Sequence, residues 1–175
     1  MMFFKVNRSD KENRPLIKIE WTPADWILEG MALVGLLTVF GTAIYNFPKL
    51  PDTIPTHFNA AGQPDGYGNK SVFLMFPAIS LLLYLLLSLI SLIPHRFNYP
   101  VKITPQNALK QYTMGTRLIR YLKMSLILLF FDINYSIIRH INNTSQGLGL
   151  WFLPVVLGFI FIPVIIYFIL SYKNS

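Results

Sequence analysis

Four long apolar stretches divide the chain. They cover residues 26–45, 72–93, 118–138 and 148–170. Each has the roughly 20 residues that an α-helix needs to cross the hydrocarbon core of a bilayer. The second and fourth stretches contain no charged residue, and the third contains an uncharged run from Met124 to Phe131 that is apolar except for Ser125. The pattern predicts an all-α fold, an integral membrane four-helix bundle.

The first stretch has a clear helix start. Thr22 can cap the helix, Pro23 suits its first position, and Asp25 lies where the acid of a capping box belongs. Glu29 follows one turn later, and we expect it at the membrane interface. Small residues recur every fourth position from Gly30 and predict a face that packs closely against another helix.

Composition agrees with a membrane protein. Hydrophobic residues make up 53% of the 175 positions and charged residues 13%, about half the share of charge in a soluble domain. The chain has no cysteine, which excludes disulfides, thiol catalysis and cysteine metal sites. The net charge of +7 fits basic cytoplasmic loops, and no basic stripe with interleaved aromatic residues indicates a nucleic-acid partner.

Basic residues predict the orientation. One side of the predicted bundle holds Lys5, Arg8, Lys11, Arg14, Lys18, Arg96, Lys102, Lys110, Arg117, Arg120, Lys123 and Lys173. The other side holds Lys49, Lys70 and Arg139. Basic residues favour the cytoplasm, so both termini are expected there, in a multi-pass protein of the cell membrane. Residues 1–25 are then a cytoplasmic basic tail and residues 26–175 a single membrane domain.

Three basic residues open the third stretch. Arg117, Arg120 and Lys123 lie within two turns of its cytoplasmic end. Long basic side chains near a helix end can extend to the lipid headgroups. We therefore expect these three to reach the membrane surface.

The connection between the first two spans is rich in proline and glycine. It covers residues 46–71 and lies on the extracytoplasmic side in this orientation. Pro51 and Pro55 extend the chain, and the segment from Gln63 to Gly66 predicts a tight turn. Two short extended pieces around this turn would form a small cap on the outer end of the bundle.

This loop carries a recurring motif. It consists of Pro51, Asp52, the run Ile54-Pro55-Thr56-His57-Phe58, Gly62, Asp65, Gly68 and Lys70. The motif resembles the signature of the DUF1648 family, which includes immunity and signalling proteins similar to the SdpI type. Those proteins resist a secreted peptide toxin, and they have more spans and a further domain that the second half of this chain does not match. The resemblance implies that ligand-binding residues are among Pro51, Asp52, Pro55, His57, Gly62, Asp65 and Lys70.

The same loop admits a metal site. Asp52, His57 and Asp65 could hold a divalent ion, and His140 could approach from the outer end of the third span. However, the chain has no HExxH motif or other established ligand spacing. The alternative is an ordered loop in which His57 bonds to backbone and the two aspartates cap turns. We expect no cofactor and assign no catalytic residue.

Asp132 is the main polar residue inside a span. An intramembrane acid is costly and is a functional candidate by default. Arg139 lies two turns further along the same helix, about 10 Å away along the axis. A structural role would pair Asp132 with Arg139 or Lys70, whereas a functional role would be proton or ligand contact.

The sequence thus leaves three functions open. The first is sensing of, or immunity to, an extracellular peptide or other ligand through the outer loop. The second is a membrane-embedded metal-dependent hydrolase, and the third is a small transporter component that uses Asp132. An enzyme is the less favoured class, and a membrane partner or a homo-oligomer is compatible with all three.

Overall fold

The computed structural model describes residues 13–175. Its elements are α2 (Pro23–Asn46), η1 (Phe47–Lys49), β1 (Thr53–Phe58), β2 (Pro64–Asn69), η2 (Lys70–Leu74), α3 (Met75–Ser91), η3 (Pro94–Arg96), α4 (Ala108–Ile141) and α5 (Phe152–Lys173). Four helical segments of this part of the chain are long and apolar enough to cross a membrane. The predicted all-α membrane fold is therefore confirmed, with one small antiparallel sheet added.

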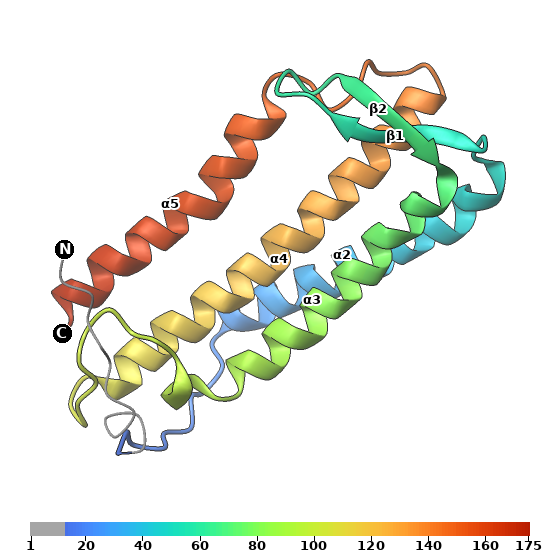
Figure 1. The fold of residues 1–175 in the computed structure, drawn as a ribbon. Coiled ribbons are helices and arrows are strands. Elements are labelled where there is room, and N and C mark those ends of the chain that lie inside the picture. Colours follow the sequence, from blue (N-terminus) through green and yellow to red (C-terminus); the bar gives the residue numbers. More distant parts are fainter. Residues whose placement is uncertain (1–12) are drawn as a thin grey trace.

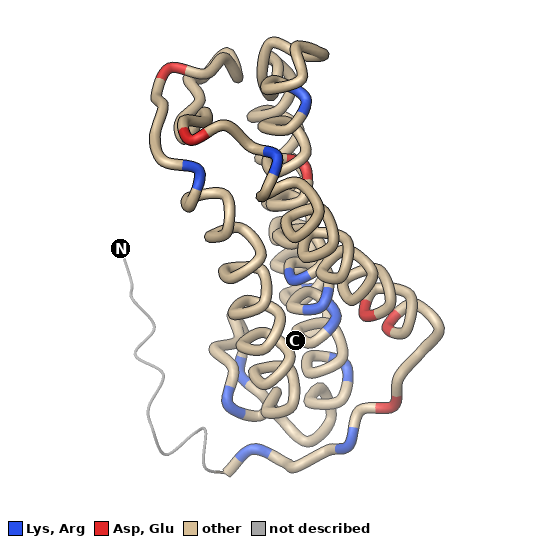
Figure 2. Tube along the Cα trace, turned by 90° about the vertical axis from the view of Figure 1, so that its right-hand side faces the viewer, with Lys and Arg blue, Asp and Glu red and all other residues tan. Residues whose placement is uncertain are grey.

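The helices run between two distinct ends. The β1–β2 hairpin and the connection from α4 to α5 lie at one end, and the α3–α4 connection and the C-terminus lie at the other (Figure 1). Lys and Arg residues gather in the half of the molecule away from the hairpin (Figure 2). This separation agrees with an even number of spans and with the charge asymmetry of the sequence.

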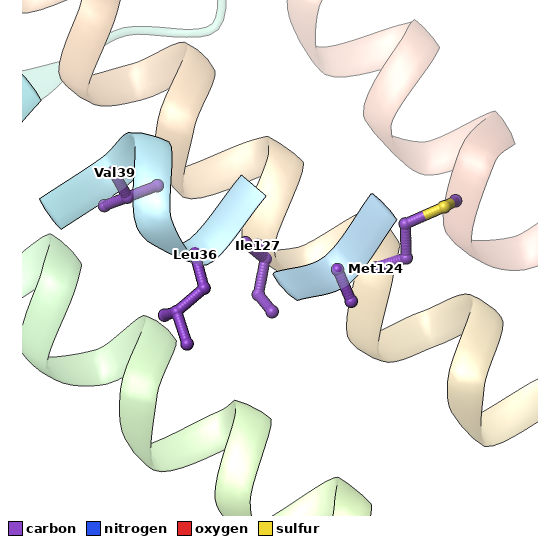
Figure 3. Packing of buried hydrophobic residues seen from close by; sticks show 5 residues of the cluster. Leu36, Val39, Met124 and Ile127 are labelled. Atoms are coloured by element: carbon purple, nitrogen blue, oxygen red, sulfur yellow. The ribbon is translucent and has the colours of Figure 1, made fainter. Parts of the chain in front are cut away.

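The central core joins α2 to α4. Ala32, Leu36 and Val39 of α2 meet Met124 and Ile127 of α4, all of them buried. Figure 3 shows four of these side chains between the two helices. Gly30, the first residue of the predicted small-residue face, takes no part in this contact, since its added Cβ would meet nothing. Gly35 does take part, because a Cβ there would lie 3.1 Å from Ile127 Cγ2 of α4.

Helix α4 is the centre of the arrangement. It begins at Ala108, ten residues before the predicted span, because its polar first turns are buried against the α3–α4 connection. Tyr112 of this extension stacks on Tyr99, with ring centroids 5.6 Å apart. The N-terminal segment joins the same cluster, because Arg14 donates from Nη1 to the Phe97 carbonyl at 2.7 Å. Arg14, Ile17 and Ile19 of the predicted tail thus pack on this connection, and residues 23–25 already belong to α2. Residues 1–12 of the tail lie outside the described residues.

Helix α5 is set apart from α2 and α3. It follows α4, on the opposite side from the other two helices (Figure 1). Its most apolar stretch has no buried residue, and it is apolar all round, as expected of a helix in contact with lipid. Its C-terminal end is tied to α4 by Gln111, which donates to the Ser171 carbonyl at 2.9 Å. The result is a three-helix unit with α5 attached along one side.

Candidate functional site

The family-like motif folds as the β1–β2 hairpin. Ile54 pairs with Gly68 and His57 pairs with Gly66, with a register shift between Pro55 and His57. Gly66 is required here, since an added Cβ would lie 2.9 Å from the Cβ of His57. The two predicted extended pieces are therefore confirmed as strands.

The turn of the hairpin lies earlier than predicted. Asn59 organises it: its side-chain oxygen accepts from the backbone N–H groups of Ala61 and Gln63, at 2.9 and 3.0 Å. Gly62 supplies the left-handed conformation, with φ at 72°. The predicted turn at Gln63–Gly66 is wrong, because Pro64 to Gly66 are already part of β2. The turn is centred earlier because the Asn59 side chain accepts hydrogen bonds that a backbone carbonyl would otherwise accept in a turn.

The turn rests on the α4–α5 connection. Gly62 accepts at its carbonyl from the Leu148 N–H at 2.7 Å. A Cβ at Gly62 would lie 2.4 Å from the Gly149 carbonyl oxygen, and one at Gly147 would meet the Gly62 oxygen. The two loops can approach this closely because Gly62 and Gly147 carry no side chain, whereas an added Cβ at Gly149 would meet nothing within 4 Å.

The base of the hairpin is held by Lys70 and Asp52. The Lys70 ammonium lies 3.1 Å from the Asp52 carboxylate, and the Lys70 N–H donates to the Asp52 carbonyl at 3.0 Å. Ile54 of β1 is fully buried with Phe73 and Ile137, so the inner face of the hairpin belongs to the core of the bundle. These contacts attach the hairpin to the helices at its base, its inner face and its turn.

The outer face of the hairpin is polar and exposed. His57 Nδ1 lies 2.5 Å from an Asp65 carboxylate oxygen, and the two side chains are 72% and 42% exposed. Tyr67 lies next along β2 and is 58% exposed. His57 therefore meets a carboxylate and not the backbone partner that an ordered-loop role predicted.

The structure does not bring the predicted metal ligands together but places those of the loop in separate ion pairs. Asp52 is engaged with Lys70, whereas Asp65 is engaged with His57. No hydrogen bond or ion pair joins His57 to His140 in the described part of the chain. Nor do any three His, Asp or Glu side chains among residues 13–175 come together as a metal site would need. The loop is thus an ordered hairpin with one exposed His–Asp pair.

A second charged site, at the opposite end, was not predicted. The Asp25 carboxylate is fully buried and accepts from Arg120 Nη1 at 3.0 Å and from Arg117 Nε at 3.3 Å. It also accepts from the Thr22 N–H at 2.9 Å, which confirms the predicted start of α2. The Asp25 carboxylate therefore has two roles: it caps the start of α2, and it pairs with two arginines of α4.

The cluster continues one turn further into the helices. Lys123 is fully buried, and its ammonium donates to Glu29 at 2.6 Å and to Ser88 Oγ at 2.8 Å. Arg120 Nε lies 3.5 Å from the other Glu29 oxygen. The prediction that Arg120 and Lys123 extend to the lipid headgroups is wrong, because both are buried and paired with acids of α2. We call Glu29, Arg120 and Lys123, with Asp25 and Arg117, the inner ion-pair cluster.

A sequence signal for this cluster was present. Asp25 and Glu29 are four residues apart on one helix, and Arg120 and Lys123 are three apart on another. The first and third of four consecutive spans cross in the same direction, so acids and bases near their starts lie at one depth. Buried charges are stabilised by such pairing.

Asp132 differs from the inner cluster. Neither Lys70 nor Arg139 comes within ion-pair distance of it in the described chain, and the charge of Arg139 acts on it only at longer range. Lys70 is already held by Asp52, and the guanidinium of Arg139 lies 5.8 Å from the Tyr135 ring. The Asp132 side chain instead lines a groove between α4 and α5.

Comparison with known proteins supports the identity of the hairpin region. Residues 33–81 match the family described as "Domain of unknown function (DUF1648)". An uncharacterized protein of Archaeoglobus fulgidus is 34% identical over 47 residues, which are 27% of this chain and 26% of that protein. No solved structure matches the chain. The match to the DUF1648 family thus covers the second half of α2, the hairpin and the start of α3.

Proposed function

We propose that this multi-pass membrane protein binds an extracytoplasmic ligand through the outer face of its β1–β2 hairpin. The observation that carries the proposal is the contrast between the two faces of the hairpin. Its inner face is fixed by Ile54 and by the contact of Gly62 with the α4–α5 connection. Its outer face presents His57, Asp65 and Tyr67 to solvent.

This contrast suits recognition. An anchored hairpin loses little conformational freedom when it binds, so less of the interaction energy is spent on ordering it. The exposed face combines an aromatic ring with a His–Asp pair. Such a surface can contact both the apolar and the polar groups of a peptide. The resemblance to SdpI-type immunity proteins motivates a peptide toxin as the ligand.

The proposal requires the hairpin to lie outside the cytoplasm. The basic residues that gather in the other half of the molecule support this orientation. The chain has no cysteine, so single cysteines can report exposure directly. Cysteines placed at Asn59 and Asn143 should react with an impermeant maleimide on intact cells, and one placed at Gln106 should react only after the cells are opened. The reverse pattern would place the hairpin in the cytoplasm.

A growth assay tests the ligand class. A bacterial host that makes the full chain would be challenged with a panel of secreted membrane-active peptides. The wild-type chain should raise the growth-inhibiting concentration of at least one peptide several-fold. The double variant His57→Ala/Tyr67→Ala should lose that protection, because both changes lie on the outer face of the hairpin.

The matched control is Gly30→Ala in α2, where an added Cβ would meet nothing and which should keep the protection. Membrane levels of all variants would be compared on blots. Protection by the hairpin variant equal to that of wild type would refute the role of this face. An absence of protection against every peptide would refute the peptide-immunity form of the proposal.

A further inference from the structure

A groove runs between α4 and α5 on the hairpin side of the helices. It has a volume of about 230 Å³. The lining is almost wholly apolar and includes Leu128, Leu129, Phe152, Val155 and Phe159. The groove exists because α5 is set apart from α2 and α3 and packs along α4 (Figure 1).

One carboxylate lines this groove. Asp132 has no hydrogen-bond or ion-pair partner within the described part of the chain, in contrast to the acids of α2. It lies nine residues before the end of α4, which places it about 13 Å below that end. A carboxylate at that depth is costly unless an opposite charge or a hydrogen-bond donor accompanies it.

We propose that the α4–α5 groove binds a small amphiphilic organic cation. An ammonium group would pair with Asp132, and its apolar body would lie against the side chains of α4 and α5. The inference rests on the groove and its carboxylate and is independent of the hairpin proposal.

The residues that line the α4–α5 groove favour an organic cation over a metal ion. A metal ion needs several oxygen ligands, and Asp132 supplies the only carboxylate among the lining residues. The other side-chain oxygen, Ser125 Oγ, donates to the Tyr121 carbonyl at 2.9 Å. An organic cation needs a single counter-charge and gains from burial of its apolar part. The volume is below the roughly 300 Å³ of a drug-sized site, so the ligand is small.

Matched photoreactive probes test the site. The full chain in lipid nanodiscs would be exposed to a diazirine-bearing octylamine and, separately, to the octanol of the same length. At neutral pH the amine is cationic and the alcohol is not. The amine should label residues 125–132 and 152–160 saturably, unlabelled octylamine should compete, and mass spectrometry would locate the adducts. The alcohol should label the same residues only weakly.

Asp132→Asn is the decisive variant, because it keeps the shape and removes the charge. It should weaken apparent binding of the amine by about tenfold or more, the difference expected when a hydrogen-bonded charge is lost. Thr38→Ala, which alters a separate groove between α2 and α4, should leave the labelling unchanged. Equal labelling of wild type and Asp132→Asn, or equal labelling by amine and alcohol, would overturn the proposal. A dimer in which a second copy fills the groove and excludes the probe would also overturn it.

Discussion

Helix α4 carries two charged regions within its predicted span that differ in burial and in pairing. Arg120 and Lys123 are buried and paired with acids of α2. Asp132 lies nine residues after Lys123, about 13 Å along the axis, and lines an open groove without a partner. The first region joins three helices, since Lys123 also donates to Ser88 of α3. The second region is bordered by α5, which offers no charged residue near it.

The two regions differ in whether the charge is paired within the fold or is left without an ion-pair partner. A buried ion pair is held because removal of one partner leaves the other uncompensated. The inner ion-pair cluster therefore fixes the relative positions of α2, α3 and α4. The Asp132 carboxylate forms no ion pair in the described chain, and Arg139 acts on it only at longer range, so we expect the fold to depend little on it. We interpret the first region as a determinant of folding and the second as a site for a ligand.

The largest effect is expected at Lys123. Lys123→Met fills similar space but removes the ammonium, which leaves Glu29 with only the longer contact to Arg120. Loss of one member of a buried pair costs about 3–5 kcal/mol. The free energy of unfolding in lipid nanodiscs should fall by this amount.

The double variant Glu29→Gln/Lys123→Met provides the control. It removes both charges, so it should recover most of the stability that the single variant loses. A double variant less stable than Lys123→Met would mean that Glu29 stabilises the fold through other contacts, and the pairing would not explain the cluster.

The spans were predictable because their signal is local. Twenty consecutive apolar residues identify a membrane helix without any knowledge of its neighbours, and the start of α2 at Thr22 and Pro23 was readable in the same way. The first turns of α4 were missed because Gln111, Thr113 and Thr116 are polar. Gln111 is buried through its hydrogen bonds to Ser171 at the end of α5, and the neighbouring Tyr112 packs on the aromatic residues of the preceding connection.

The inner ion-pair cluster was missed for a related reason. From the sequence alone, contact with lipid headgroups is a satisfactory local explanation for each basic residue in the first half of α4. Only the packing of α2 on α4 shows that Asp25 and Glu29 pair with these basic residues inside the protein. In the hairpin, the motif residues were correctly singled out as a cap. Their division into an Asp52–Lys70 base and a His57–Asp65 surface pair depends on strand register.

An intermediate effect is expected at the turn of the hairpin. Gly62→Ala forces a side chain into a left-handed position and toward the Gly149 backbone. Strain of this kind costs about 1–3 kcal/mol. Amide hydrogen exchange in the hairpin and the α4–α5 connection should accelerate, because the contact between the two loops opens.

Gly41→Ala is the matched control for that change. Gly41 lies in α2, and an added Cβ there would meet nothing within 4 Å. Alanine should therefore be neutral or stabilising by up to about 1 kcal/mol, because it favours the helix. Equal acceleration of exchange in the two variants would argue against the specific contact at Gly62.

The smallest effect on stability is expected at His57. The His57–Asp65 pair is largely exposed, and pairs of this kind contribute about 0–1 kcal/mol. His57→Ala should thus leave the unfolding free energy nearly unchanged while it alters ligand binding by the outer face. A loss as large as that of Lys123→Met would show that the pair is structural, contrary to the contrast drawn here.

The most direct test compares two isosteric changes, Glu29→Gln and Asp132→Asn. Each converts an intramembrane carboxylate into an amide of the same shape, and unfolding of both variants would be measured in the same nanodiscs. We predict a clear loss of stability for Glu29→Gln, because the buried Lys123 ammonium loses its counter-charge, and no loss or a gain for Asp132→Asn. A loss at Asp132 equal to or larger than the loss at Glu29 would contradict the account.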